Sequence, residues 1–394
     1  MILRVQTRAY LDHNATTPLR PEARAAMNAG LDLLGNASSV HAEGRAARAK
    51  VEAARAEIAG LVATAGKNVV FTSGATEALN LALTPTLEIG RQSAPFERLL
   101  IGGGEHACVL SGHRFPQAAV EILPLTGDGV IDLDALAATL SRHAGTRVML
   151  ALQLANNETG IVQPVNAAAS LVHAVGGGVV CDAVQAVGRI ACDFTALNAD
   201  VLAISAHKFG GPQGIGALCF APGTYHIRSM VLRGGGQERG LRAGTENVAA
   251  IMGFAAAMKI AVGDAERLGS CLAAWRDGIE RRVAEIAPDA VFFGARAQRL
   301  PNTSNFAVAS LEAQVLLMAL DLEGVAVSSG SACSSGKVRR SHVLEAMGVS
   351  ADLAQGAIRL SLGWNSGAQD LAQFEQAFEK SVRIVKARQV RPAA

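Results

Sequence analysis

The sequence has little net charge and no long apolar run. Its 394 residues include 36 Lys and Arg against 34 Asp and Glu, a formal net charge of +2. This balance gives no electrostatic reason to expect nucleic acid or an anionic membrane as the main partner. No uninterrupted apolar segment approaches the roughly 20 residues that span a bilayer. The start of the chain also lacks the apolar core of a signal peptide.

Cysteine is scarce and scattered. No CxxC pair occurs, and a chain of this length with such a pattern is expected to hold reduced, mostly buried thiols rather than disulfides or a zinc site. We therefore expect a cytoplasmic protein. The six cysteines are Cys108, Cys181, Cys192, Cys219, Cys271 and Cys333.

Short apolar runs alternate with alanine-rich stretches over the first two thirds of the chain. The runs are continuous rather than alternating, which is typical of strands covered on both faces. Strand and helix in alternation predict an α/β domain with a mostly parallel sheet, whose ligands lie beyond the carboxyl ends of the strands. The expected strands are residues 68–72, 98–102, 147–154, 178–182, 200–205 and 215–220, and the expected helices include 42–62 and 166–174.

The pattern changes after a glycine-rich stretch at residues 233–244. We expect a helix at 247–262 and then a smaller α+β domain. The large domain is predicted at residues 14–262, and the small one at 1–13 and 263–394. The small domain's expected elements are strands at 290–293, 304–308, 324–328 and 357–362 and a last helix at 369–386.

Two segments place polar groups at strand ends. In FTSGATEALN (71–80) a helix is expected to begin at Ala75 or Thr76, where free N–H groups and the helix dipole suit a phosphate. An ordinary helix cap is the alternative. In CDAVQAVG (181–188), Asp182 is expected to be buried and so to need a cation, such as the protonated nitrogen of a pyridine ring. Asp182 as a helix cap is the alternative, and Gln185 would share its face if a helix had begun.

One lysine follows a hydrophobic strand and precedes several glycines, in AISAHKFGGPQG (203–214). Lysine is seldom buried without a reason, and a desolvated lysine becomes a Schiff-base nucleophile. Ser205 and His207 beside Lys208 are suited to hold a phosphate. A solvated loop lysine is the alternative, which the flanking residues disfavour.

One cysteine lies among small residues in VSSGSACSSGK (327–337). We expect Cys333 to be exposed, and the basic residues that follow it would favour its nucleophilic thiolate. The alternative is a flexible linker with an incidental cysteine.

Taken together, these segments resemble the cysteine desulfurases, the NifS-like branch of the class V aminotransferase superfamily. The resemblance covers nearly the whole chain and implies a fold-type I transferase that uses pyridoxal 5′-phosphate (PLP). The SSGSAC form resembles the first of two desulfurase groups. The motifs, in order, are LDHNATT, SGATEALN, GEHACV, NNETG, DAVQ, SAHK, GGGQERGLRAGTEN, SSGSACSS and IRLSLG.

The resemblance implies a role for each residue at the cofactor ring. Lys208 would hold PLP covalently, and Asp182 would pair with the ring nitrogen. Gln185 and Asn157 would lie near the ring hydroxyl. His106 would stack on the ring and act as an acid or base; a core histidine is the alternative.

The resemblance also implies phosphate and substrate residues. Thr245 would reach the phosphate of a partner subunit, which implies a homodimer. Arg359 would bind the substrate carboxylate through two hydrogen bonds, with Asn14 and Asn157 close by; a structural ion pair is the alternative for Arg359. Within one chain the phosphate would be held by Ala75, Thr76, Ser205 and His207.

The implied reaction converts L-cysteine to L-alanine and keeps the sulfur as a persulfide on Cys333. The sulfur would pass to an acceptor protein, such as an iron–sulfur scaffold, for iron–sulfur cluster biogenesis or thiolation. No dedicated metal site is expected, although Cys333 could serve as a transient iron–sulfur ligand. The alternatives are another class V PLP enzyme, a selenocysteine lyase or an aminotransferase, which would not need Cys333, and a non-catalytic scaffold.

Overall fold

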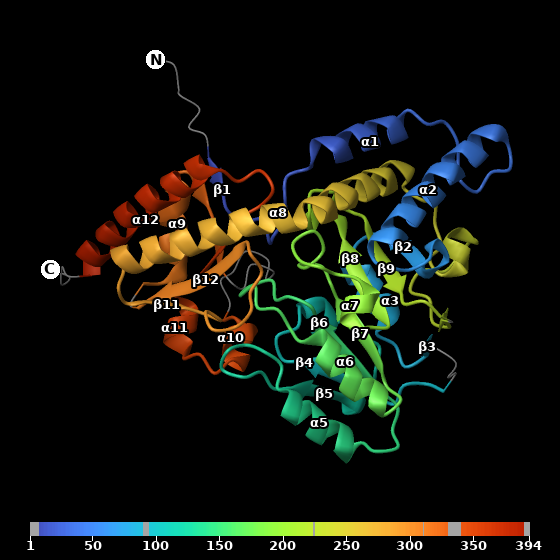
Figure 1. The fold of residues 1–394 in the computed structure, drawn as a ribbon, viewed down its shortest axis with the longest axis horizontal. Helices are drawn as coiled ribbons and strands as arrows, with labels where there is room; N and C mark the ends of the chain where they lie inside the picture. The colour runs from blue at the N-terminus through green and yellow to red at the C-terminus, as the bar shows by residue number, and fades with distance from the viewer. Residues whose placement is uncertain (1–7, 90–93, 224, 310, 330–339, 390–394) are drawn as a thin grey trace.

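The main sheet has seven strands. The computed structural model describes residues 8–89, 94–223, 225–309, 311–329 and 340–389 (Figure 1). Only β9 runs antiparallel to its neighbours in this sheet, so the other six strands are parallel. The strands lie in the order β2 (Val69–Thr72), β9 (Gly216–Phe220), β8 (Val201–Ser205), β7 (Gly178–Asp182), β6 (Val148–Gln153), β4 (Arg98–Gly102) and β5 (Val120–Leu123).

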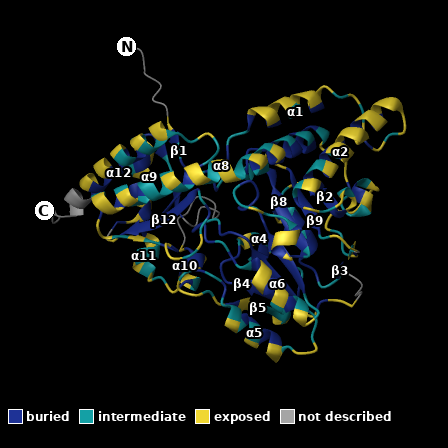
Figure 2. Ribbon diagram, viewed as in Figure 1, coloured by how far each residue is buried: buried dark blue, intermediate teal, exposed yellow. Residues whose placement is uncertain are grey.

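Helices cover both faces of this sheet, which explains the continuous apolar runs. Successive residues of each central strand enter two different hydrophobic clusters: Leu150 packs on one face and Met149 on the other. The strands are accordingly buried, with exposed residues on the outer helices (Figure 2). The six strands predicted from the sequence are confirmed to within one residue at each end. The helices of this region are α1 (Pro21–Leu31), α2 (Ala42–Leu61), α3 (Ala75–Ala82), α4 (Ala107–Leu110), α5 (Leu133–Arg142), α6 (Val165–Ala174) and α7 (Phe194–Leu197).

A second, four-stranded sheet lies toward the C-terminus, and its strands are all antiparallel. It packs with helices around its own hydrophobic cluster, which includes Phe306, Phe374 and Phe378. The strand order is β11 (Ala290–Phe292), β12 (Thr303–Val308), β15 (Ala357–Ser361) and β14 (Ser328–Ser329). The helices are α9 (Ala313–Leu322), α10 (His342–Ala346), α11 (Ala351–Gln355) and α12 (Ala368–Gln389).

Helix α8 (Val248–Ile286) joins the two regions and is much longer than predicted. The expected end at residue 262 is wrong. Polar residues begin there because the helix leaves the large cluster, which includes Ala261, before it enters the small one at Leu272. By length and composition alone α8 could cross a membrane, but half of its most apolar window is buried, and core helices of soluble proteins pass the same test. The domain boundary drawn at 262 stays a prediction.

The strand expected at residues 324–328 is also wrong as a single element. The chain there forms two short strands that bond to different partners. β13 (Val325–Ala326) pairs in parallel with β1 (Ala9–Tyr10), whereas β14 pairs with β15. The remaining elements are the strand pair β3 (Leu87–Ile89) and β10 (Tyr225–Ile227), and the 3-10 helices η1 (Gly66–Asn68), η2 (Gln117–Ala119), η3 (Ala206–Lys208) and η4 (Gln237–Gly240).

The cysteines outside residues 330–339 are all free thiols, as predicted. The expectation that they are mostly buried is correct only in part. Cys181 and Cys219 are buried in the sheet, Cys108 and Cys192 are partly buried, and Cys271 is exposed on α8.

Candidate active site

A cavity of about 660 Å³ lies beyond the carboxyl ends of the central strands. Gln153, Asp182 and Ser205, the last residues of β6, β7 and β8, all line it. This is the edge of the sheet where the sequence predicted a ligand. Of the predicted site residues in the described ranges, all but Thr245 line the cavity: Asn14, Ala75, Thr76, His106, Asn157, Asp182, Gln185, Ser205, His207, Lys208 and Arg359.

Lys208 ends η3 and reaches toward the N-terminal segment of the chain. Its Nζ donates hydrogen bonds to the carbonyl oxygens of Asn14, at 2.6 Å, and Ala15, at 2.9 Å. These two hydrogen bonds hold the amine at the cavity wall, where its charge also acts on Asp182. This placement favours the Schiff-base role over that of a solvated loop lysine.

Asp182 brings a buried carboxylate to the cavity. Burial raises the pKa of Asp182, while a hydrogen bond from the Val184 N–H and the charges of His106 and Lys208 oppose the rise. A cation in the cavity would therefore stabilise its ionised form. A turn rather than a helix follows the strand, so the conditional helix at Gln185 is wrong. Gln185 lines the cavity nonetheless, and its side chain donates a hydrogen bond to the Asn14 carbonyl.

His106 precedes α4, and its ring nitrogen Nδ1 caps that helix. The Cys108 N–H donates to Nδ1 over 3.2 Å, and the Cys108 Sγ lies 3.0 Å from the same nitrogen. An Nδ1 that accepts a hydrogen bond leaves the proton of a neutral imidazole on Nε2. His106 is thus prepared to donate a proton from Nε2, and Cys108 joins the cavity wall beside it.

The N-terminus of α3 offers backbone N–H groups to the cavity. The first intrahelical bond is donated by Ala78 to the Gly74 carbonyl, so the N–H groups of Ala75 and Thr76 precede the regular pattern. Gly216 allows this turn to pack closely on β9, since a Cβ there would lie 2.8 Å from the Gly74 Cα. The α3 N-terminus therefore presents a surface of backbone N–H groups that suits an anion.

His207 lies next to this surface as a neutral side chain. Burial, followed by the charges of Lys208 and Arg189, lowers the pKa of His207 to about 4. Its Nδ1 lies 3.1 Å from the Thr16 hydroxyl oxygen. A neutral imidazole can still donate a hydrogen bond to a phosphate oxygen, so this setting is compatible with the predicted phosphate role of His207, which stays a prediction.

Arg359 enters the cavity from β15 of the second sheet, with a nearly fully buried side chain. Its Nη2 donates to the Asp12 carboxylate at 2.6 Å and its Nη1 to the Asn157 carbonyl at 3.1 Å. Nε has no hydrogen-bond partner within the described part of the chain. Guanidinium has five N–H groups, so this ion pair leaves donors for a carboxylate. The structural and substrate-binding roles of Arg359 are therefore compatible.

Comparisons with known proteins agree with this geometry. The profile of the family described as Aminotransferase class-V matches residues 9–374. A cysteine desulfurase of Cereibacter sphaeroides is 41% identical over 370 residues, which is 92% of each chain. The chain belongs to the class V aminotransferase family.

Solved structures give the same result. A NifS-like protein from Rickettsia africae is 30% identical, with a TM-score of 0.86 over 95% of this chain and 99% of that one. A structure described as SspA in complex with cysteine is 27% identical, with a TM-score of 0.73 over 90% of this chain and 99% of that one. The predicted fold, a PLP-dependent transferase of fold type I, is confirmed.

Class V aminotransferases use PLP, and the residues of the cavity fit that cofactor. The volume suits a small molecule. The α3 N-terminus lines the cavity and can accept a phosphate, and the buried Asp182 carboxylate would be stabilised by a cation such as a protonated ring nitrogen. Lys208 lines the same cavity and supplies an amine, and the strand β8 that precedes it lies between β2 and β7 in the sheet. The role of each residue stays a prediction.

Two predicted residues are not among the described residues that line the cavity. Thr245 is exposed and does not line the cavity, so it does not join the site within one chain. Cys333 lies outside the described residues. In the described ranges no group of three or more His, Cys, Asp or Glu side chains is arranged to hold a metal ion.

Sequence reasoning missed several side chains that support the site. Asp12 pairs with Arg359, Gln153 and Cys108 line the cavity, and Arg189 contacts Lys208 from behind. Asp12 and Cys108 lie inside the motifs LDHNATT and GEHACV, so those motifs carried a signal for them. Nothing in the sequence pointed to Arg189.

Replacing Asp182 with asparagine should weaken PLP binding by about a hundredfold, because removing one partner of a buried ion pair costs about 3 kcal/mol or more. The dissociation constant for PLP, measured by absorbance, checks this. Asp193→Asn is the matched control. Asp193 caps α7 far from the cavity, and asparagine caps helices as well as aspartate does. Equal affinity in Asp182→Asn and wild type would contradict the assignment.

Glu158 should make stability depend on pH. Burial raises the pKa of Glu158 from 4.5 to about 7, although a hydrogen bond from Ser341 and the charges of Arg359 and His106 oppose the rise. The folded state therefore holds this proton more tightly than the unfolded state does. The resulting stabilisation is complete below pH 4.5 and lost as pH rises through about 7. Relative to wild type, Glu158→Gln should thus gain thermal stability between pH 5 and 8, by up to about 3 kcal/mol. A difference in unfolding temperature that stays constant with pH would exclude this.

Proposed function

We propose that the protein is a PLP-dependent cysteine desulfurase that converts L-cysteine to L-alanine and keeps the removed sulfur as a persulfide on Cys333. One observation supports this most strongly. Lys208, Asp182 and Arg359 converge on one cavity, in a chain 41% identical to a cysteine desulfurase.

Different residues of the cavity bind the substrate and transfer protons. Arg359 binds the substrate carboxylate through the N–H groups that Asp12 and Asn157 leave, and Asn14 lies beside it because its amide donates to the Asn157 carbonyl. Bound PLP supplies an electron sink that acidifies the Cα proton of the amino acid. The Lys208 Nζ would take that proton, and His106, which lines the same cavity, would donate one from Nε2.

Sulfur leaves by attack of the Cys333 thiolate. The carbon–sulfur bond of cysteine breaks, a sulfur–sulfur bond forms on Cys333, and the freed carbon takes a proton to become the methyl group of alanine. The step balances without an external oxidant, because the sulfur is oxidised as that carbon is reduced. A thiol reductant then releases the sulfur and restores Cys333.

The chain on both sides of Cys333 contacts the site. On one side Ser328 pairs with Arg359 across β14 and β15. On the other side the Ser341 hydroxyl donates to the Glu158 carboxylate, and the His342 Nε2 lies 2.8 Å from the Glu105 carbonyl. Glu158 and Glu105 adjoin Asn157 and His106 in the sequence. These anchors support a role for Cys333 at this cavity.

We further propose that the enzyme is a cytoplasmic homodimer that passes sulfur to an acceptor protein, such as an iron–sulfur scaffold. The exposed Thr245 is available to a second subunit, and the free thiols suit a reducing compartment. The acceptor would meet Cys333, which could then be a transient cluster ligand in iron–sulfur biogenesis.

Alanine and sulfide formation tests the proposed reaction. Purified protein given L-cysteine and a thiol reductant, with no keto acid, should release alanine and sulfide in equal amounts. A strict requirement for a keto acid would instead indicate an aminotransferase. Turnover of L-selenocysteine without turnover of L-cysteine would indicate a selenocysteine lyase.

A further inference from the structure

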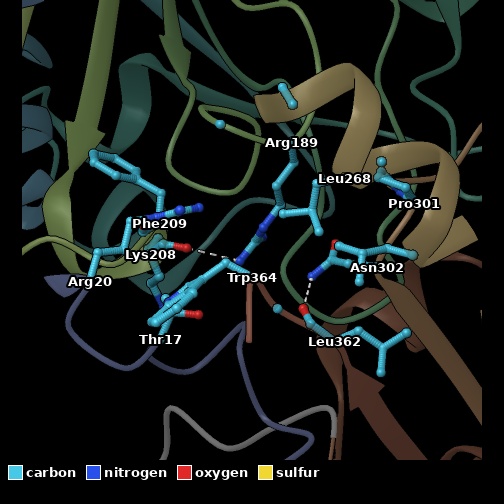
Figure 3. Close-up of a pocket in the computed structure, with 15 residues that line it drawn as sticks. Thr17, Arg20, Arg189, Lys208, Phe209, Leu268, Pro301, Asn302, Leu362 and Trp364 are labelled. Atoms are coloured by element: carbon cyan, nitrogen blue, oxygen red, sulfur yellow. Dashed lines mark hydrogen bonds between the residues drawn. The ribbon is translucent and has the colours of Figure 1, made fainter. Parts of the chain in front are cut away.

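Arg189 lies behind the active-site cavity, in a smaller space of about 30 Å³ that has room for little more than water. Arg20, Phe209 and Trp364 also line this space (Figure 3). Lys208 is shared by both cavities, so Arg189 faces the backbone of the residue whose amine faces the active site. The Arg189 side chain points toward the Lys208 carbonyl in Figure 3.

The Arg189 guanidinium contacts three separate segments. Its Nη2 donates to the Lys208 carbonyl at 3.1 Å and to the His13 carbonyl at 3.3 Å. Its Nη1 donates to the Gln185 backbone carbonyl at 3.0 Å and also to the Gln185 side-chain oxygen Oε1. The planar guanidinium of Arg189 thus links three segments: the end of η3, the N-terminal turn and the turn after β7.

These contacts settle the orientation of the Gln185 amide. Guanidinium can only donate hydrogen bonds, so the oxygen of the amide must face Arg189 and its NH2 group must face away. The NH2 group donates to the Asn14 carbonyl at 3.0 Å. The same carbonyl accepts from the Lys208 Nζ. Gln185, Asn14 and Lys208 therefore form one network, which Arg189 orients from behind.

The charge of Arg189 has no counterpart nearby. It forms no ion pair with any carboxylate in the described ranges, and burial lowers the pKa of Arg189 to about 9, which leaves it charged at neutral pH. Its charge contributes to the low pKa values of His13 and His207. Burying a charged group that has no carboxylate partner is unfavourable for folding. A role of Arg189 at the active site therefore explains its burial better than a purely structural role does.

We propose that Arg189 is a positioning residue of the PLP site, which presents the Gln185 amide to the cofactor and holds the Lys208 backbone against the N-terminal turn. The inference rests on the proposed function only in placing Gln185 and Lys208 at PLP. Arg189 does not line the active-site cavity, so it acts through these two residues.

A double-mutant cycle on the holoenzyme tests this. The readout is the rate of PLP loss after dilution into a carbonyl trap, which needs no turnover. Arg189→Met and Gln185→Ala should each speed PLP loss by about tenfold, the effect of a lost hydrogen bond to a charged or buried group. The double variant should speed PLP loss by clearly less than the roughly hundredfold product of the two single effects, because Arg189 acts partly through Gln185 and partly through the Lys208 backbone.

Arg20→Met is the matched control. Arg20 lines the same small space, donates to the Phe209 carbonyl at 2.9 Å and lies over the Trp364 ring. It should leave the rate of PLP loss nearly unchanged. Equal acceleration by Arg20→Met, independent effects of Arg189→Met and Gln185→Ala, or no effect of Arg189→Met would each overturn the proposal.

Arg189→Lys keeps the cycle decisive if Arg189→Met does not fold. Lysine retains the charge but cannot bond Gln185 and two carbonyls in one plane. It should restore folding while PLP loss stays faster than in wild type, and in the Gln185→Ala background the further increase should again be smaller than in the wild-type background. A wild-type protein that held no PLP would refute the proposed function instead, so the two failures are distinguishable.

Discussion

Replacing Lys208 with alanine should yield a folded protein that forms no covalent link with PLP and desulfurates cysteine about 10⁴-fold more slowly, or worse. The loss is large because one amine serves both as the attachment point and as the base. Among the described residues that line the cavity, no other lysine is present to replace it. Visible absorbance and alanine formation measure the two effects separately.

A lysine remote from the cavity provides the control for this prediction. Lys259 on α8 pairs with Glu57 at the surface, and Lys259→Ala should keep the wild-type spectrum and rate. Added PLP should bind to Lys208→Ala without covalent attachment, because the α3 N-terminus and Asp182 remain. A borohydride-reducible chromophore of wild-type intensity in Lys208→Ala would rule out this lysine.

Replacing Cys333 with serine should separate cofactor chemistry from sulfur transfer. The variant should keep the PLP absorbance and still bind L-cysteine, because every described residue of the cavity wall is unchanged. Alanine and sulfide production should fall below about 1% of the wild-type rate, since a serine hydroxyl is not ionised at neutral pH and cannot form a persulfide. Spectral titration with L-cysteine and quantification of alanine test both parts.

Two other cysteines serve as controls. Cys271 is exposed on α8, so Cys271→Ser tests whether any accessible thiol suffices. Cys108 is the stronger alternative candidate for the thiol that accepts the sulfur, because it lines the cavity beside His106. Burial raises the pKa of Cys108. The Cys108 thiol therefore ionises less readily than an exposed thiol does, which makes it a poorer nucleophile. Both variants should desulfurate cysteine normally, and a severe loss in Cys108→Ser with full activity in Cys333→Ser would transfer the role to Cys108.

The large domain was predictable because its strands are buried on both faces. A strand such as β7 is a continuous apolar run that ends at a charged residue, so its limits are visible in the sequence. The same logic placed Asp182 and Lys208 at one edge of the sheet, where parallel strands bring their carboxyl ends together. The family motifs then added residues such as Arg359 that come from a different sheet.

The predictions of element boundaries failed where one continuous segment packs against, or pairs with, two different parts of the fold. The polar residues near 263–267 of α8 read as a helix end, yet they mark only the passage between two hydrophobic clusters. Residues 324–328 read as one strand because pairing to β1 and to β15 depends on partners far away in the sequence. Arg189 was missed for a similar reason. Its acceptors belong to residues 13, 185 and 208, and no spacing predicts that they meet.

The covalent link between PLP and Lys208 is the central claim, and peptide mapping tests it most directly. The holoenzyme is reduced with borohydride, digested and examined by mass spectrometry for a phosphopyridoxyl lysine. The modification should occur on the peptide that contains Lys208 and on no other. Modification of a different lysine, or none in a protein saturated with PLP, would contradict the account.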